Sequence, residues 1–215
     1  MSDNRKIIQI KPTDDWYIIT WMMSNRCNQS CCYCPDEYHS ADGKIYSLDE
    51  FKTIWKDIFS KTQQFGLKYK ISFTGGEVTI QKSFLPFLEW LYENYRDHIG
   101  LSLLSSNGSA SANYYLRAFK YIDNLSISIH SEFINEKKLF EKIIKINETL
   151  PSGKFFHVNI MDEPWNRDRQ KYYEQILKDN NIYYSVNFLN NYNNKPFIPI
   201  FNGGLNFELS EPYKL

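Results

Sequence analysis

The chain has 215 residues, with 25 basic and 25 acidic side chains and therefore no formal net charge. This length suits one soluble domain with a single core. The charge balance disfavours a protein whose main task is to bind nucleic acid, since such proteins carry an excess of Lys and Arg. No stretch approaches the roughly 20 apolar residues of a membrane helix, and the polar N-terminus does not resemble a secretory leader, so we expect a cytoplasmic protein without a membrane partner.

Apolar residues predict strands and helices in regular alternation along the chain. A bulky apolar run at 16–23 predicts a first strand that is buried on both faces. Ser47 and Glu50 have the spacing of a capping box, which predicts a helix that ends near Gly66. The later strands are expected near 70–73, 101–105, 124–130, 155–161 and 183–189, and the later helices near 84–95, 114–120, 139–146 and within 168–179.

This alternation predicts the fold class. Strands that alternate with helices form a parallel sheet with right-handed crossovers, and helices expected on only one face favour a barrel over a doubly wound sheet. We therefore expect an α/β fold, a partial (βα)6 TIM-like barrel that is open on one side. Residues 190–215 are rich in Asn, Pro and Gly, which predicts an irregular closing segment. The whole chain, 1–215, is expected to be one domain with its core at 16–189.

All four cysteines lie within eight positions, as Cys27, Cys31, Cys32 and Cys34. A disulfide framework is disfavoured, because such cysteines join distant segments in small secreted domains. Cys27, Cys31 and Cys34 have the spacing Cys-x3-Cys-x2-Cys. Three thiolates on one loop can hold three irons of a 4Fe-4S cluster and leave the fourth iron open. The same three with His39 would also suit zinc, and the spacing alone leaves both metals open.

Two further motifs follow predicted strands. Gly75-Gly76-Glu77 comes after the second strand, and the sequence Ser105-Ser106-Asn107-Gly108 ends the third. Together with the cysteine loop, in which Tyr33 occupies the aromatic position of Cys-x3-Cys-x-aromatic-Cys, these motifs resemble the radical S-adenosylmethionine (SAM) enzymes over residues 16–189. The resemblance favours iron-sulfur over zinc.

The resemblance implies a chemistry and a set of roles. Cys27, Cys31 and Cys34 would hold a 4Fe-4S cluster whose fourth iron binds the amino and carboxylate groups of SAM. Reductive cleavage of SAM would then give methionine and a 5'-deoxyadenosyl radical that abstracts a hydrogen atom from the substrate. Gly75 and Gly76 would let the backbone approach SAM, and Glu77 would accept a hydrogen bond from its ammonium group. The other SAM contacts implied by the motifs are Tyr33, Ser106 and Asn107.

Strand alternation predicts which side chains face the barrel lumen. In the fourth and fifth strands the expected inward faces are polar, and comprise Ser126, Ser128, His130, His157, Asn159 and Met161. Ser128 and Asn159 are candidate contacts for the ribose or carboxylate of SAM. His130 is a candidate acid or base for the substrate radical, or it hydrogen-bonds a neighbouring loop. Asp162 and Glu163, at the end of the fifth strand, could contact substrate, although solvated side chains are favoured, and Pro164 after them is expected only to end the strand.

Departures from the family pattern narrow the expected reaction. No second cysteine cluster follows the first, so a minimal member that acts on a small-molecule, nucleotide or sugar substrate is expected, with an electron donor such as flavodoxin or ferredoxin. Cys32 fits no ligand position and is expected to be a small buried residue. Enzymes similar to 7-carboxy-7-deazaguanine synthase or to glycyl-radical activases remain alternatives. A non-enzymatic module that binds zinc or an iron-sulfur cluster is the alternative from another class.

Overall fold

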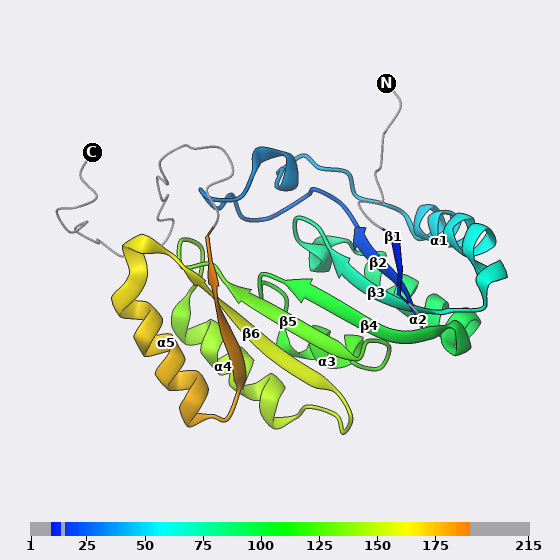
Figure 1. Cartoon of the computed structure of the whole chain (residues 1–215). Helices are drawn as coiled ribbons and strands as arrows, with labels where there is room; N and C mark the ends of the chain where they lie inside the picture. Colours follow the sequence, from blue (N-terminus) through cyan, green and yellow to red (C-terminus); the bar gives the residue numbers. More distant parts are fainter. Residues whose placement is uncertain (1–9, 14–15, 190–215) are drawn as a thin grey trace.

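The computed structural model describes residues 10–13 and 16–189, which form one seven-stranded sheet and five helices (Figure 1). The strands are β1 (Ile10–Thr13), β2 (Trp16–Met22), β3 (Lys68–Thr74), β4 (Ile99–Ser106), β5 (Asn124–Ile129), β6 (Phe155–Asp162) and β7 (Tyr183–Phe188). The helices are α1 (Leu48–Thr62), α2 (Phe84–Tyr95), α3 (Ala112–Ala118), α4 (Glu136–Glu148) and α5 (Arg167–Asp179). The closing segment expected at 190–215 lies outside the described residues.

The sheet follows the order of the chain, β1-β2-β3-β4-β5-β6-β7. Strands β2 to β7 run parallel to one another, and β1 is antiparallel to β2. Six parallel strands joined through helices confirm the predicted α/β class. The sequence did not predict β1, which is only four residues long and contains Pro12. Proline is tolerated there because β1 is an edge strand, where one side of the ladder needs no donor.

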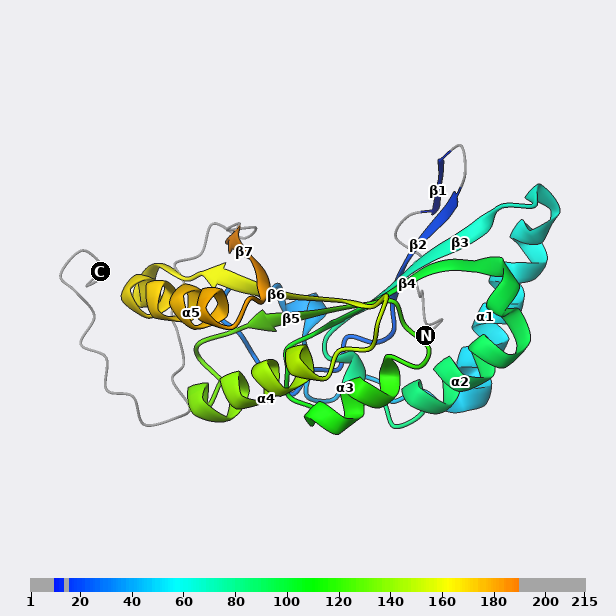
Figure 2. The same cartoon turned by 90° about the horizontal axis from the view of Figure 1, so that it is seen from below.

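The helices lie along one face of the curved sheet, and the opposite face is open (Figure 2). Alternate side chains explain this one-sided cover. In β5, Leu125, Ile127 and Ile129 are at most 1% exposed, whereas Ser126 and Ser128 are partly exposed. The apolar face of the strand therefore packs on the helices, and the polar face is directed to the open side. This arrangement confirms the expected partial barrel, and the two edge strands β1 and β7 leave it unclosed.

Aromatic residues form the core between the sheet and the first two helices. The Trp21 ring of β2 lies 6.4 Å from Trp55 of α1 and 5.3 Å from Phe87 of α2, between ring centroids. Phe73 of β3 contacts the same tryptophan at 6.1 Å. Burying each of these large rings contributes about 2–3 kcal/mol from the removal of apolar surface from water. The cysteine loop begins directly after β2 and is therefore anchored to a well-packed part of the molecule.

The predicted capping box is present at the start of α1. The Ser47 hydroxyl accepts a hydrogen bond from the backbone N–H of Glu50, and the Glu50 carboxylate accepts one from the Ser47 backbone N–H.

No helix in the described part of the chain is long and apolar enough to cross a bilayer.

Candidate functional site

The C-terminal ends of the parallel strands surround a cavity of about 330 Å³ beneath the cysteine loop. The parallel sheet brings these ends together at one edge, which is where such folds place their sites. The lining residues follow β2 to β7 in turn and are Cys27, Gln29, Cys31, Tyr33, Cys34, Pro35, Tyr38, His39, Thr74, Gly75, Gly76, Ser105, Ser106, Asn107, Ser128, His130, Met161 and Leu189. All three motifs of the sequence thus meet at one cavity.

Backbone hydrogen bonds close the cysteine loop at its base. The N–H of Cys27 donates to the carbonyl of Ser40 at 3.0 Å, and the N–H of Ser40 donates to the carbonyl of Asn25 at 2.8 Å. Within the loop, the N–H of Cys34 donates to the carbonyl of Cys31 at 3.0 Å. The loop is therefore a closed turn with its own internal structure.

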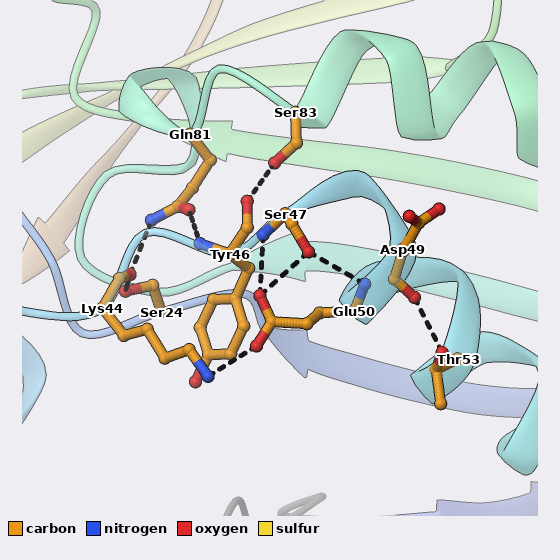
Figure 3. A network of polar contacts seen from close by, with 9 residues as sticks. All are labelled: Ser24, Lys44, Tyr46, Ser47, Asp49, Glu50, Thr53, Gln81 and Ser83. Carbon is orange, nitrogen blue, oxygen red and sulfur yellow. Dashed lines mark hydrogen bonds and ion pairs between the residues drawn. The ribbon is translucent and has the colours of Figure 1, made fainter.

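A polar network fixes the segment that leads from the cysteine loop to α1 (Figure 3). Gln81 is fully buried, and its side chain accepts from the N–H of Tyr46 at 2.9 Å and donates to the carbonyl of Lys44 at 3.1 Å. The Ser83 hydroxyl donates to the Tyr46 carbonyl at 2.5 Å, and the Ser24 hydroxyl to that of Lys44 at 2.7 Å. The loops after β2 and β3 thus hold this segment in place.

Gly75 and Gly76 allow the loop after β3 to pack against the backbone that leads into Cys27. A Cβ on Gly75 would lie 2.3 Å from the carbonyl oxygen of Ser24, and one on Gly76 would lie 2.3 Å from that of Arg26. Gly75 also has φ +140°, which side-chain-bearing residues rarely adopt. The N–H of Gly76 donates to the Ser24 carbonyl at 2.8 Å. The glycines thus permit a close approach between two parts of this chain, and their expected contact with SAM stays a prediction.

The three cysteines predicted as ligands share the wall of the cavity, and Cys32 does not belong to that wall. Instead, the backbone N–H of Cys32 donates to the Glu132 carboxylate at 3.2 Å. Burial raises the pKa of Cys27, Cys31 and Cys34, the last to about 11. The thiols are therefore neutral near pH 7 in the metal-free loop, and metal binding has to displace their protons.

The donor set is compatible with an iron-sulfur cluster. No three His, Cys, Asp or Glu side chains between residues 16 and 189 converge closely enough to hold one metal ion. His39, the fourth ligand of the zinc alternative, has its Nε2 3.1 Å from the carbonyl oxygen of Cys34. A tetrahedral zinc site needs its ligands on one atom, whereas a cluster takes each thiolate on a separate iron. Three thiols spread around one cavity suit the second case.

Glu77 is 1% exposed and does not line the cavity. Its carboxylate accepts from the N–H and hydroxyl of Thr79 at 2.9 and 2.6 Å, from the Ser106 hydroxyl at 2.8 Å and from the Asn107 N–H at 2.6 Å. Burial raises the pKa of Glu77, and these bonds oppose that shift. The carboxylate therefore has other partners than the SAM ammonium group expected from the resemblance. It joins the second motif to the third.

Asn107 extends this connection to the cysteine loop. Its side-chain amide donates to the Asn28 side-chain oxygen at 2.9 Å and lies 3.9 Å from the Cys27 sulfur. Glu77 thus fixes the backbone of Asn107, and Asn107 contacts the loop that carries the first cysteine. The three motifs form one hydrogen-bonded unit.

The inward-facing residues of β5 and β6 divide into two groups. Ser128 and His130 line the cavity, as expected. Asn159 lies outside the lining, where its amide donates to the Ser126 hydroxyl at 2.7 Å and its oxygen accepts from the Ser185 hydroxyl at 3.0 Å. Asn159 thus bridges three neighbouring strands below the cavity, and its predicted contact with SAM has no counterpart in the cavity wall.

The sequence favoured a solvated Glu163 over one that contacts substrate, yet its side chain is only 2% exposed and contacts the cysteine loop. Its Oε1 accepts from the Tyr33 hydroxyl at 3.1 Å, and both its oxygens accept from Ser131. The Tyr33 hydroxyl lies 2.5 Å from Nδ1 of His130. The position of Glu163 at the C-terminal end of a parallel strand was visible in the sequence, but its partners Tyr33 and Ser131 were not.

The geometry defines a class of protein, a partial (βα) barrel with a three-cysteine loop over the strand ends. No protein-family profile matches the sequence. A curated relative, GTP 3',8-cyclase of Pasteurella multocida (strain Pm70), is 26% identical over 136 residues, which are 62% of this chain and 38% of the relative. The chain thus matches well under half the length of this relative.

Two solved structures superpose on this chain to different extents. The structure of SuiB from Streptococcus suis superposes with a TM-score of 0.58 and 16% identity, over 85% of this chain and 41% of that one. The structure of BtrN in complex with AdoMet and 2-DOIA superposes with a TM-score of 0.49 and 16% identity, over 66% of this chain and 56% of that one. The strand-end motifs, the curated relative and the shared fold together support the resemblance to the radical SAM superfamily of enzymes.

Proposed function

We propose that the protein is a radical SAM enzyme in which Cys27, Cys31 and Cys34 hold a 4Fe-4S cluster. One observation carries the proposal, namely that these thiols and both other motifs line a single cavity at the strand ends. When bound, the cluster would supply the electron that cleaves SAM to methionine and a 5'-deoxyadenosyl radical. Three protein thiolates leave one iron of such a cluster without a protein ligand, which is the position SAM requires.

The residues of the chain supply the surroundings of this chemistry. The cysteine loop and the strand ends both line the cavity, so residues from these two parts of the chain would surround a radical formed there. Gly75 and Gly76 place backbone groups at the wall, and Ser105 and Ser128 offer short polar side chains there. These groups can orient the amino acid and ribose parts of SAM with little steric cost.

A polar small molecule is the substrate class that the cavity favours. Its lining includes Ser105 and Ser128, whose hydroxyl groups suit the hydroxyl groups of a nucleotide or a sugar. The name of the curated relative, GTP 3',8-cyclase, also denotes a nucleotide substrate. We extend the proposal to the reductant, and expect a small one-electron carrier such as flavodoxin or ferredoxin.

Anaerobic SAM cleavage tests the proposal. The chain is reconstituted with iron and sulfide, reduced with dithionite and mixed with SAM, and 5'-deoxyadenosine is measured together with bound iron. Wild-type protein should bind about four irons per chain and form 5'-deoxyadenosine, because a 4Fe-4S cluster contains four. Cys31→Ala should lose both properties, and Cys32→Ala, the matched control on the same loop, should keep both. Stoichiometric zinc without SAM cleavage would refute the proposal.

A further inference from the structure

Two glutamates lie buried behind the cysteine loop, and the chemistry described so far uses neither. Glu132, after β5, and Glu163, after β6, are each 2% exposed. A buried carboxylate is costly unless donors compensate its charge or it keeps a proton. The Glu163 carboxylate accepts hydrogen bonds from the Tyr33 hydroxyl and from both the N–H and the hydroxyl of Ser131. The Glu132 carboxylate accepts a hydrogen bond from the backbone N–H of Cys32.

The Tyr33 hydroxyl stands between two groups that can each take its single hydrogen. Its oxygen lies 2.5 Å from Nδ1 of His130 and 3.1 Å from Oε1 of Glu163. A phenol has one hydrogen to donate and can accept another. When Glu163 is ionised, Tyr33 donates to Glu163 and accepts from Nδ1–H of His130. When Glu163 is protonated, the chain reverses, because Glu163 donates to Tyr33 and Tyr33 donates to Nδ1.

The reversal moves the hydrogen of the histidine ring from one nitrogen to the other. His130 lines the cavity, and its Nδ1 is occupied by Tyr33. Nε2 forms no hydrogen bond with the described residues and is the ring nitrogen left for a ligand in the cavity. We propose that His130, Tyr33 and Glu163 form a proton relay that exchanges a proton between a group bound in the cavity and a carboxylate buried behind the cysteine loop.

The step balances without any change in oxidation state. A proton leaves an acidic group of the bound substrate or product and joins Nε2 of His130. Nδ1 then gives its proton to the Tyr33 oxygen, and Tyr33 gives its own to Glu163. Tyr33 stays neutral before and after, and the negative charge passes from Glu163 to the group in the cavity. In the opposite direction the relay donates a proton to that group.

The electrostatics of the network suit this assignment. Burial raises the pKa of Glu163 to about 7, so a proton can be stored on Glu163 or released from it near neutral pH. Burial lowers the pKa of His130 to about 4, so the ring carries a proton onward without staying charged. The titratable groups whose charges act on or near Glu163 are Tyr33, Glu132, His130 and the thiols of Cys31 and Cys32.

Infrared spectroscopy on anaerobic holoprotein with 13C-labelled glutamate tests the relay between pH 5 and pH 9. The wild type should show the carbonyl stretch of a protonated, buried glutamic acid that disappears as the pH rises through neutrality. Glu163→Gln should lose this band, and Glu132→Gln, the matched control from the same buried pair, should keep it. A band that persists in Glu163→Gln and is lost in Glu132→Gln would overturn the assignment.

The histidine tautomer, followed by imidazole marker bands in Raman spectra, tests the coupling itself. In the wild type the ring hydrogen should move from Nε2 to Nδ1 as Glu163 ionises. Tyr33→Phe should abolish this coupled change and raise the pKa of Glu163, because a donor to the ionised form is lost. A ring hydrogen that stays on the same nitrogen of His130 between pH 5 and pH 9 in the wild type would overturn the relay. This measurement uses wild-type protein, so it decides the question even if Glu163→Gln does not fold.

The relay rests on the proposed function, because it needs a substrate in the cavity, but the two fail in different ways. Absence of 5'-deoxyadenosine from wild-type protein would refute the radical chemistry and would leave the infrared titration unchanged. If the protein cleaves SAM but shows no pH-dependent carbonyl band of a protonated glutamic acid, the relay alone is refuted.

Discussion

Replacement of Glu77 by alanine tests the claim that this residue organises the motifs around the cavity. The carboxylate accepts four hydrogen bonds in a site that water does not reach. Alanine removes the acceptor and leaves the four donors in place. A fall in stability is therefore expected, even though the side chain does not line the cavity.

The size of the effect follows from the partners that remain. The Ser106 hydroxyl also lies 2.7 Å from that of Tyr115, and the Thr79 hydroxyl can rotate, so both can find other partners. The backbone N–H groups of Thr79 and Asn107 cannot turn to other acceptors. Each buried donor without an acceptor lowers the free energy of unfolding by about 1–3 kcal/mol. Alanine also removes a buried carboxylate, whose desolvation disfavours folding, and this offsets part of the loss in stability. A net loss of about 3 kcal/mol corresponds to a decrease in Tm of roughly 6–12 °C for a chain of this size.

Thermal unfolding followed by circular dichroism measures the change, with all proteins prepared anaerobically in the same way. Glu93→Ala, an exposed glutamate on α2, is the matched control and should stay within about 0.5 kcal/mol of the wild type. Glu77→Gln keeps one acceptor oxygen and should lie between the control and Glu77→Ala. If Glu77→Ala melts within about 2 °C of the wild type, the reasoning from its hydrogen bonds is wrong.

Three further predictions concern the loop, the buried acid and the core. Gly76→Ala places a Cβ 2.3 Å from the carbonyl oxygen of Arg26, so the cysteine loop has to move and bound iron after reconstitution should drop; normal iron content would contradict the close approach. The pKa of Glu163 rises from 4.5 in the unfolded chain to about 7 in the folded one, so the folded state binds the proton more tightly. Stability from this group should therefore fall by about 2–3 kcal/mol between pH 5 and pH 8, and urea titrations of Glu163→Gln should lack that part of the pH dependence. Trp55→Ala empties a fully buried site and should cost about 3–5 kcal/mol in the same urea titration, whereas a loss under 1 kcal/mol would mean that α1 is loosely packed.

The sequence was sufficient to place the parallel strands, and in the later ones the inward and outward faces differ clearly. The expectation that the first of them, β2, is buried on both faces was wrong, because only alternate residues of β2 are buried. In β5 and β6, apolar and polar residues alternate, and the register sets Ser128 beside Asn159. The first strand, β1, has no such pattern and contains Pro12. It pairs with β2 as an antiparallel edge, which depends on the neighbouring strand more than on its own residues.

The starts of two helices show what periodicity alone misses. The structure begins α3 at Ala112 and α4 at Glu136, before the first strongly apolar residues that marked these helices in the sequence. In both cases a polar residue caps the first turn, Ser111 by accepting from the N–H of Tyr114 and Asn135 by accepting from that of Lys138. Caps satisfy the free N–H groups of the first turn and extend a helix beyond its apolar face.

The convergence of the three motifs could be predicted, because parallel strands bring their C-terminal ends to one edge. The partners of Glu77 and Glu163 could not. Tyr33 and Glu163 are 130 positions apart and meet only because the cysteine loop reaches across the barrel mouth to β6. The same three-dimensional placement turned Asn159 toward Ser126 and Ser185 and away from the cavity wall.

The most direct test of the open iron is the low-temperature electron paramagnetic resonance spectrum of the reduced protein, recorded with and without SAM. Under the proposed function, Cys27, Cys31 and Cys34 would leave one iron free for SAM, so the spectrum of the reduced protein should change on addition of SAM in the wild type and in Cys32→Ala. A cluster signal that SAM leaves unchanged would contradict the account and would mark the protein as an electron carrier.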